Sequence, residues 1–105
     1  MALYELRTYT VVVGQMQNVV TLYRDEGWPA LEKHAGKLVG YFTGDVGAMN
    51  QLTHLWRFED DADRREHWKR VFSDDDFMAF AAKLRPMLQS QQNQVMFNAP
   101  WGPQP

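Results

Sequence analysis

Alternating apolar and polar positions open the chain and then give way to a helical period. Leu3 to Val13 is rich in Tyr, Thr and Val and alternates between two faces, which predicts a β-strand. From about Gln15 the apolar residues recur at helical spacing, at Met16, Val19, Val20 and Tyr23. Gly27–Pro29 breaks this helix, and Pro29 suits the first turn of a second, shorter helix that reaches His34 or Ala35.

The rest of the chain continues with short strands and helices. Aspartates stand where the later helices begin, and a proline stands where the last one ends. In order, the sequence predicts a strand over Lys37–Thr43, a turn over Gly44–Gly47, a strand over Asn50–Phe58, a helix from Asp60 or Asp61 to about Phe72, a helix that restarts at Ser73–Asp76 and ends near Pro86, and a short strand over Asn93–Asn98.

These elements follow the order β-α-β-β-α-β, with both helices broken. Two interleaved βαβ units in this order form the ferredoxin-like α+β fold, in which the first and third strands lie side by side at the centre of the sheet and both helices cover one face. We expect a single domain over residues 1–98 and a proline-rich tail over residues 99–105.

Side-chain alternation assigns the residues of each strand to one of two faces. On the face toward the helices we place Tyr4, Leu6 and Thr8 of the first strand and Leu52, His54, Trp56 and Phe58 of the third. The uncovered face would then hold Glu5, Arg7, Tyr9, Val39, Tyr41, Gln51, Thr53, Leu55 and Arg57. It mixes aromatic, aliphatic and charged side chains, and a second copy packed sheet to sheet would cover it. The sequence therefore predicts a homodimer with Glu5 and Arg7 paired at its interface.

Composition narrows the function classes. The 105 residues include no Cys, which excludes disulfides, Cys-ligated zinc, iron–sulfur clusters and a thiolate nucleophile. The formal net charge is −2, so the basic surface of a nucleic-acid-binding protein is missing. The N-terminus has no basic segment before an apolar run, and no stretch approaches the roughly 20 apolar residues of a membrane span. We therefore expect a cytoplasmic protein without a membrane span.

The strongest candidate for chemistry is His54, which lies on a central strand between apolar neighbours. A partly buried imidazole can act as an acid or base near neutral pH, and the alternative is a structural histidine that is hydrogen-bonded in the core. Aromatic walls and a few polar groups are typical of small-molecule pockets. The candidate ligand-binding residues are Tyr4, Thr8, Asn50, Trp56, Trp68 and Arg85, with core packing, strand entry for Asn50 and helix termination for Arg85 as the structural alternatives.

A metal site is not indicated by the sequence. His34, His54 and His67 fall on three different predicted elements, and no histidine pair has the spacing of zinc ligands. We therefore expect no metal and no cofactor, although one histidine would be enough to ligate haem.

Several blocks of the sequence resemble the NIPSNAP family, and together they cover nearly the whole chain. The first is Tyr4–Thr10, and a late one is Leu84–Leu88, followed by the proline-rich end. The most specific match is the central block, which comprises Gly40-Tyr41-Phe42-Thr43, Gly47, Asn50-Gln51, His54-Leu55-Trp56 and Phe58-Glu59-Asp60. The resemblance implies a dimeric α+β barrel, in which two ferredoxin-like sheets pack face to face. The wider group with this fold includes cofactor-independent monooxygenases and isomerases.

Two functional hypotheses follow. The first is a small-molecule-binding protein or enzyme that holds a hydrophobic or aromatic compound between sheet and helices, with His54 as acid or base in cofactor-independent oxygenase or isomerase chemistry. The second is a non-catalytic protein-interaction module that binds a partner through exposed helices or through Trp101 in the tail. The eukaryotic members of the family, which are linked to mitochondria and vesicle traffic, suggest this second role. We prefer the first, because a compact domain has few segments with which to recruit partners.

Overall fold

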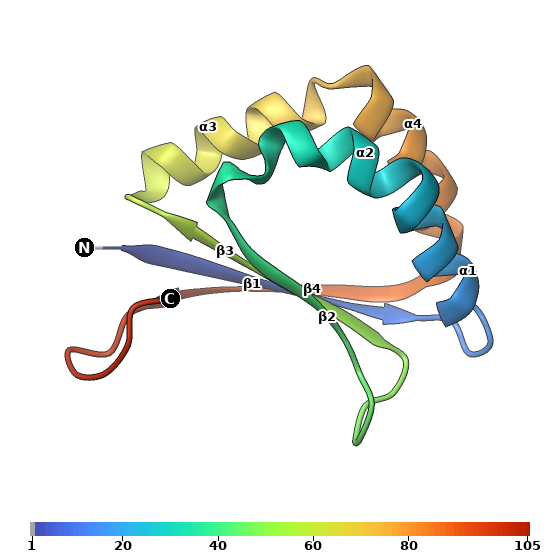
Figure 1. Ribbon diagram of the computed structural model, residues 1–105, viewed down its shortest axis with the longest axis horizontal. Helices are drawn as coiled ribbons and strands as arrows, with labels where there is room; N and C mark the ends of the chain where they lie inside the picture. The colour runs from blue at the N-terminus through green and yellow to red at the C-terminus, as the bar shows by residue number, and fades with distance from the viewer. Residues whose placement is uncertain (1) are drawn as a thin grey trace.

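The computed structural model describes residues 2–105. In chain order the elements are β1 (Leu3–Val11), α1 (Met16–Leu22), the π-helical turn η1 (Tyr23–Gly27), α2 (Trp28–Leu31), the 3₁₀ helix η2 (Glu32–Lys37), β2 (Leu38–Thr43), β3 (Gln51–Phe58), α3 (Asp61–Phe72), α4 (Asp75–Leu84), the 3₁₀ turn η3 (Arg85–Met87) and β4 (Leu88–Phe97). The strands form one antiparallel sheet in the order β2-β3-β1-β4. The helices arch over one face of this sheet and leave the other bare (Figure 1). The predicted ferredoxin-like α+β fold is confirmed.

Aspartate side chains begin both helices of the second half, as predicted. The side chain of Asp60 accepts a hydrogen bond from the backbone N–H of Asp63 at the start of α3. Asp74 does the same for α4 and accepts from the N–H groups of Asp76 and Phe77. These contacts satisfy N–H groups that the first helical turn leaves unpaired.

The predicted break at Gly27–Pro29 is milder than expected. The chain stays helical through η1 and passes into α2, where Pro29 occupies the first turn. Gly27 is needed here for a close approach rather than for a turn, because a Cβ at this position would lie 2.6 Å from the ring of Phe80 on α4. The glycine therefore lets the first helical segment pack directly on the second.

The last strand is longer than the sequence indicated. We predicted a strand over 93–98, whereas β4 begins at Leu88 and pairs with β1 over nearly its whole length. Residues 89–94 are polar and lack the alternation of a half-buried strand. Their extended conformation comes from backbone pairing with β1, a tertiary effect that local side-chain patterns do not report.

The predicted faces are correct for β3 and wrong for β1. Leu52, His54, Trp56 and Phe58 are buried under the helices. In β1, however, Leu3, Glu5, Arg7, Tyr9 and Val11 are buried under the helices, while Leu6 and Thr8 lie on the bare face. Tyr4 also lies on the bare face, where it is buried and contacts Pro105 of the tail. The register sets this, since Arg7 lies opposite His54 and Glu5 opposite Trp56, and residues paired across strands share a face. Tyr41 also lies opposite His54 and faces the helices, so its assignment to the bare face was wrong.

The hydrophobic core consists of two clusters. One joins α1 and α4 to the sheet and contains Tyr9, Val11, Val19, Leu22, Leu52, Phe80 and Leu84. The other lies under α2 and α3 and contains Leu3, Leu31, Trp56, Phe58, Trp68 and Val71. Three half-buried rings, Tyr23, Tyr41 and Phe77, pack against both clusters. Within residues 2–105 no helix has the length and apolar character to cross a membrane.

Candidate functional site

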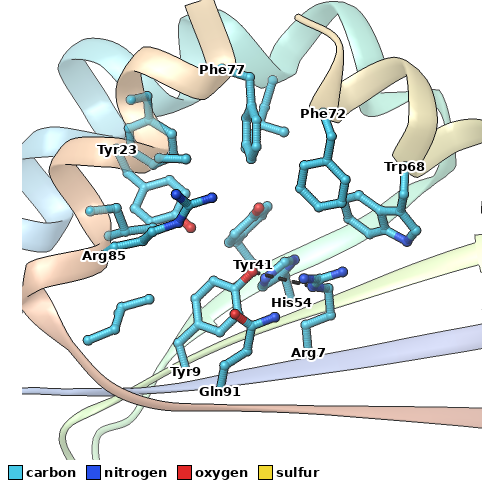
Figure 2. A pocket seen from close by; sticks show the side chains of 15 residues that line it. Arg7, Tyr9, Tyr23, Tyr41, His54, Trp68, Phe72, Phe77, Arg85 and Gln91 are labelled. Carbon is cyan, nitrogen blue, oxygen red and sulfur yellow. Dashed lines mark hydrogen bonds between the residues drawn. The ribbon is translucent and has the colours of Figure 1, made fainter.

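A cavity of about 160 Å³ lies between the sheet and the helices. The strands contribute Arg7, Tyr9, Tyr41, His54, Leu88 and Gln91, and the helical segments contribute Tyr23, Leu31, Trp68, Phe72, Phe77, Phe80, Ala81, Leu84 and Arg85 (Figure 2). Residues of both core clusters are among them. An engineered apolar cavity of about 150 Å³ holds benzene, so the volume suits a molecule with one aromatic ring. A haem tetrapyrrole is several times larger.

His54 is held among aromatic side chains at the sheet side of the cavity. It is 2% exposed, its ring stacks on Tyr41 with centroids 4.4 Å apart, and the edge of Tyr9 approaches at 5.0 Å. The indole Nε1 of Trp56 donates a hydrogen bond of 2.6 Å to Nδ1 of the imidazole. Trp56 lies two positions along β3, and residues at this spacing share a face of a strand.

The contact with Trp56 fixes the tautomer of His54. An indole N–H can only donate, so Nδ1 must be the unprotonated nitrogen and Nε2 must carry the proton of the neutral ring. Burial, followed by the positive charge of Arg7, lowers the pKa of His54 to about 3. At neutral pH His54 is therefore uncharged and is a donor through Nε2, and this atom has no hydrogen-bond partner within residues 2–105.

A buried ion network supports the same end of the cavity. Glu5, which is 1% exposed, accepts hydrogen bonds from Arg7 Nη1 at 3.1 Å, Trp68 Nε1 at 2.9 Å and Arg64 Nη1 at 3.3 Å. The guanidinium of Arg7 lies over the Trp68 ring, 4.4 Å from its centroid. Its Nε donates to the hydroxyl of Tyr9 at 3.3 Å (Figure 2). These contacts hold Arg7 in one orientation against the cavity, because both its charge and its plane are engaged.

Two tyrosines of the cavity, Tyr23 and Tyr41, remain protonated at neutral pH. Burial is the main cause that raises the pKa of Tyr23 and of Tyr41, and the neighbouring Tyr9 raises both further. The hydroxyl of Tyr9 accepts from Arg7, and a phenol hydroxyl that accepts can also donate. The polar groups of the cavity are thus mainly donors.

The mouth of the cavity carries a second cation. Arg85 and Gln91 are both exposed and line it from η3 and β4. Arg85 lies across the cavity from Arg7 (Figure 2) and makes no ion pair within the described part of the chain. No Asp or Glu is among the lining residues.

The structure brings together some of the residues that the sequence singled out. His54, Trp68 and Arg85 line the cavity, and Trp56 lies beneath His54 in the core. Tyr4 and Thr8 belong to the other face of the sheet, where Tyr4 donates to the main-chain oxygen of Pro105 and accepts from Arg57. Asn50 precedes β3, and its main-chain oxygen accepts from the N–H of Val11.

Sequence reasoning missed the contributions of β1 and β2 to the cavity. Arg7, Tyr9 and Tyr41 were placed on the bare face because the apolar strand faces were expected to meet the helices, and Tyr4, Leu6 and Thr8 were assigned to that face in β1. Glu5 and Arg7 do form an ion pair, but the prediction that it lies at a dimer interface was wrong, because the pair is buried under the helices. A signal was available, since Leu3 and Val11 share the alternation of Arg7 and Tyr9 and bracket them with apolar side chains.

The other polar features of the molecule offer less chemistry. His67 is buried between Trp56 and Trp68 and does not line the cavity, and burial lowers its pKa to about 4. Within residues 2–105 no group of three or more His, Asp or Glu side chains could hold a metal ion. A second hollow of about 330 Å³ lies beside β2, but its walls are apolar apart from Arg24, Thr43 and two tyrosines that it shares with the cavity.

Comparisons with known proteins agree with this architecture. The NIPSNAP family model matches residues 4–103. A NIPSNAP-family crystal structure from Agrobacterium tumefaciens is 32% identical with a TM-score of 0.89, over 97% of this chain and 92% of that one. Protein NipSnap homolog 3A of Homo sapiens is 24% identical over 93% of this chain, which spans 40% of that protein's length. An antibiotic biosynthesis monooxygenase, 16% identical over 93% of this chain and 99% of that one with a TM-score of 0.65, shares the fold alone. The chain belongs to the NIPSNAP family.

Proposed function

We propose that this protein binds a small aromatic molecule in the cavity between the sheet and the helices. The observation that carries the proposal is the convergence of His54 and Arg7 on a cavity whose remaining walls are aromatic and aliphatic. Small-molecule sites have this composition, with apolar walls and a few placed polar groups. The alternative is a structural histidine. Nε2 of His67 is also buried without a partner within residues 2–105, and what distinguishes His54 is that its side chain lines the cavity.

The groups that line the cavity limit the chemistry open to it. The polar ones are an imidazole, two guanidinium groups, three phenols and the carboxamide of Gln91, and they can hold and polarise an oxygen atom of the ligand. None of them is a free base, because Nδ1 of His54 is engaged by Trp56, so in isomerase or oxygenase chemistry they would polarise the ligand's oxygen rather than remove a proton. The likeness to a monooxygenase fold supports small-molecule chemistry only by analogy.

A matched pair of alanine substitutions on α4 tests ligand binding. Ala81 lines the cavity, so Ala81→Leu fills part of it, whereas Ala82 is exposed on the same helix and Ala82→Leu leaves the cavity unchanged. We expect one-ring aromatic compounds to change the fluorescence of wild-type protein through Trp68, and Ala81→Leu to weaken binding at least about tenfold. Equal binding by both variants would place the ligand elsewhere and contradict the proposal.

We also propose that the bare face of the sheet packs against a second copy of the chain. Leu6 and Leu55 lie opposite each other on the two central strands and face away from the helices, and Phe42 on β2 is 57% exposed. A sheet with helices on one side only presents such side chains to water until something covers them (Figure 1). An identical sheet is self-complementary to this face about a two-fold axis. Light scattering measures the mass of the assembly directly.

A further inference from the structure

The charges that line the cavity are all positive at neutral pH. Arg7 lines the sheet side and Arg85 the mouth, and no carboxylate lies between them. The contacts of Arg7 with Glu5 and Tyr9 use Nη1 and Nε, which leaves Nη2 for another acceptor. Glu5 is also shared with Arg64, so it only partly offsets the charge of Arg7. A cleft with one sign of charge and low-dielectric walls concentrates ligands of the opposite charge.

The uncharged ring of His54 adds a directed donor to this field. Its Nδ1 is engaged by Trp56, so the proton is on Nε2, and this buried N–H is without a partner within residues 2–105. Buried polar groups in native proteins nearly always have a partner. Within the described chain Nε2 of His67 lacks one as well, but of the two only His54 lines a cavity from which an acceptor could reach it. A neutral imidazole in this state donates to a ligand's oxygen and does not abstract a proton.

We infer that the natural ligand is a planar aromatic anion, a carboxylate or a phenolate, whose charged oxygen accepts hydrogen bonds from Arg7 and from Nε2 of His54. This inference rests on the proposed function and names its ligand class. The aromatic ring packs between Phe72, Phe77 and the tyrosines, and Arg85 contributes charge at the mouth. His54 thereby binds and polarises the oxygen. Trp56 is a positioning residue, because its hydrogen bond to Nδ1 keeps the proton of the His54 ring on Nε2.

Ligands of similar shape but different charge test, on the wild-type protein, whether the cavity prefers an anion. Benzoate and benzamide have the same outline and differ in charge, and toluene lacks the polar group. We expect calorimetric titration to give benzoate an affinity at least about tenfold higher than benzamide, since hydrogen bonds to charged groups are the stronger ones. Para-nitrophenol tests the phenolate arm, because binding should lower its pKa and develop the phenolate colour at a lower pH than in free solution.

The ligand pairs separate failure of this inference from failure of the proposed function. If toluene and benzamide bind as well as benzoate and the pKa of para-nitrophenol is unchanged, the cavity binds aromatic molecules but the anion inference is overturned. If none of the compounds binds, both proposals are overturned. A preference for either anion over its neutral counterpart supports the inference and identifies which oxygen chemistry the site accepts.

Variants then show which residue causes the preference for benzoate over benzamide. Arg7→Gln would leave Glu5 buried without the nearer of its two cationic partners and is a poor test, whereas Arg85 makes no ion pair within the described chain. We expect Arg85→Gln to weaken benzoate binding about threefold or more and to leave benzamide unchanged. Arg57→Gln changes the net charge equally on the bare face and serves as the control.

Two substitutions of His54 separate donation from proton transfer. His54→Gln keeps an N–H near the position of Nε2 but cannot titrate, and His54→Leu removes the donor. We expect His54→Gln to retain most of the preference for benzoate and His54→Leu to lose about tenfold of it. Equal preference in wild type and His54→Leu would remove His54 from the site.

Discussion

The tautomer of His54 is decided by a residue two positions along the same strand. The sequence contains the pattern His54-Leu55-Trp56, and alternation alone places the imidazole and the indole on one face. We expected both rings to line a pocket, whereas Trp56 lies in the core and donates to Nδ1 from there. What alternation cannot supply is the side-chain rotation that joins the two nitrogens, which depends on packing against Tyr41 and His67.

Two buried imidazoles make the stability of the fold sensitive to acid. His54 and His67 both have lowered pKa values, to about 3 and about 4, mainly because burial disfavours their charged forms. The unfolded chain binds these protons below about pH 6.5, whereas the folded chain does not. The free energy of unfolding should therefore be fully present above about pH 6.5 and fall with decreasing pH, by roughly 3 kcal/mol for each imidazole by about pH 4.

Urea unfolding at a series of pH values measures this dependence. His54→Leu and His67→Leu each remove one titrating group, so each variant should lose about half of the slope between about pH 6.5 and pH 4, whatever its stability at neutral pH. Asp74 contributes only at lower pH, because the hydrogen bond from Lys33, followed by that from His34, lowers the pKa of its carboxyl group. A wild-type slope that persists in both variants would mean that the imidazoles are protonated in the folded state.

Among the elements, the strands show most clearly what can be predicted from a sequence. The length and order of β1 to β3 follow from local alternation, and so do the Asp60 and Asp74 caps, because side chain and backbone are only a few residues apart. The face of β1 does not follow as simply. Its two sets of side chains are similarly polar, and the ion network of Glu5 with Arg64 on α3, which holds a charged pair inside, becomes visible only when the elements are assembled.

Contact between the helical segments η1 and α4 depends on one glycine, Gly27. Any side chain at Gly27 would meet the Phe80 ring at 2.6 Å, so Gly27→Ala must displace α4 or rotate that ring. We expect a loss of about 1–3 kcal/mol in the free energy of unfolding, as for other overpacked cores. Because Phe80 also lines the cavity, ligand binding should weaken in parallel.

Gly36 provides the matched control for this substitution. It lies in the helical segment η2, and a Cβ there would have nothing within 4 Å. Gly36→Ala should therefore leave the urea midpoint unchanged or raise it slightly, since alanine restricts the unfolded chain. Equal midpoints for the two variants would show that η1 and α4 do not approach as closely as the structure has them.

At the scale of the whole molecule, the two faces of the sheet carry different sets of side chains. The covered face holds both core clusters and the cavity, and Tyr23, Tyr41 and Phe77 link the clusters across it. The bare face carries none of the cavity-lining side chains of β1 and β3, since those residues alternate to the other side. Self-association and ligand binding should therefore respond to different substitutions on the same strand.

Leu55 and His54 are adjacent on β3 and test this separation. Leu55 is half-buried on the bare face, so Leu55→Arg places an unpaired charge at the centre of the proposed dimer contact. We expect light scattering to give the mass of one chain for Leu55→Arg and of two chains for wild type. Gln17→Arg, an equal change of charge on exposed α1, should leave the dimer intact. A wild-type mass of one chain at micromolar concentration would refute the dimer. In either assembly state Leu55→Arg should keep its affinity for benzoate, because its side chain points away from the cavity.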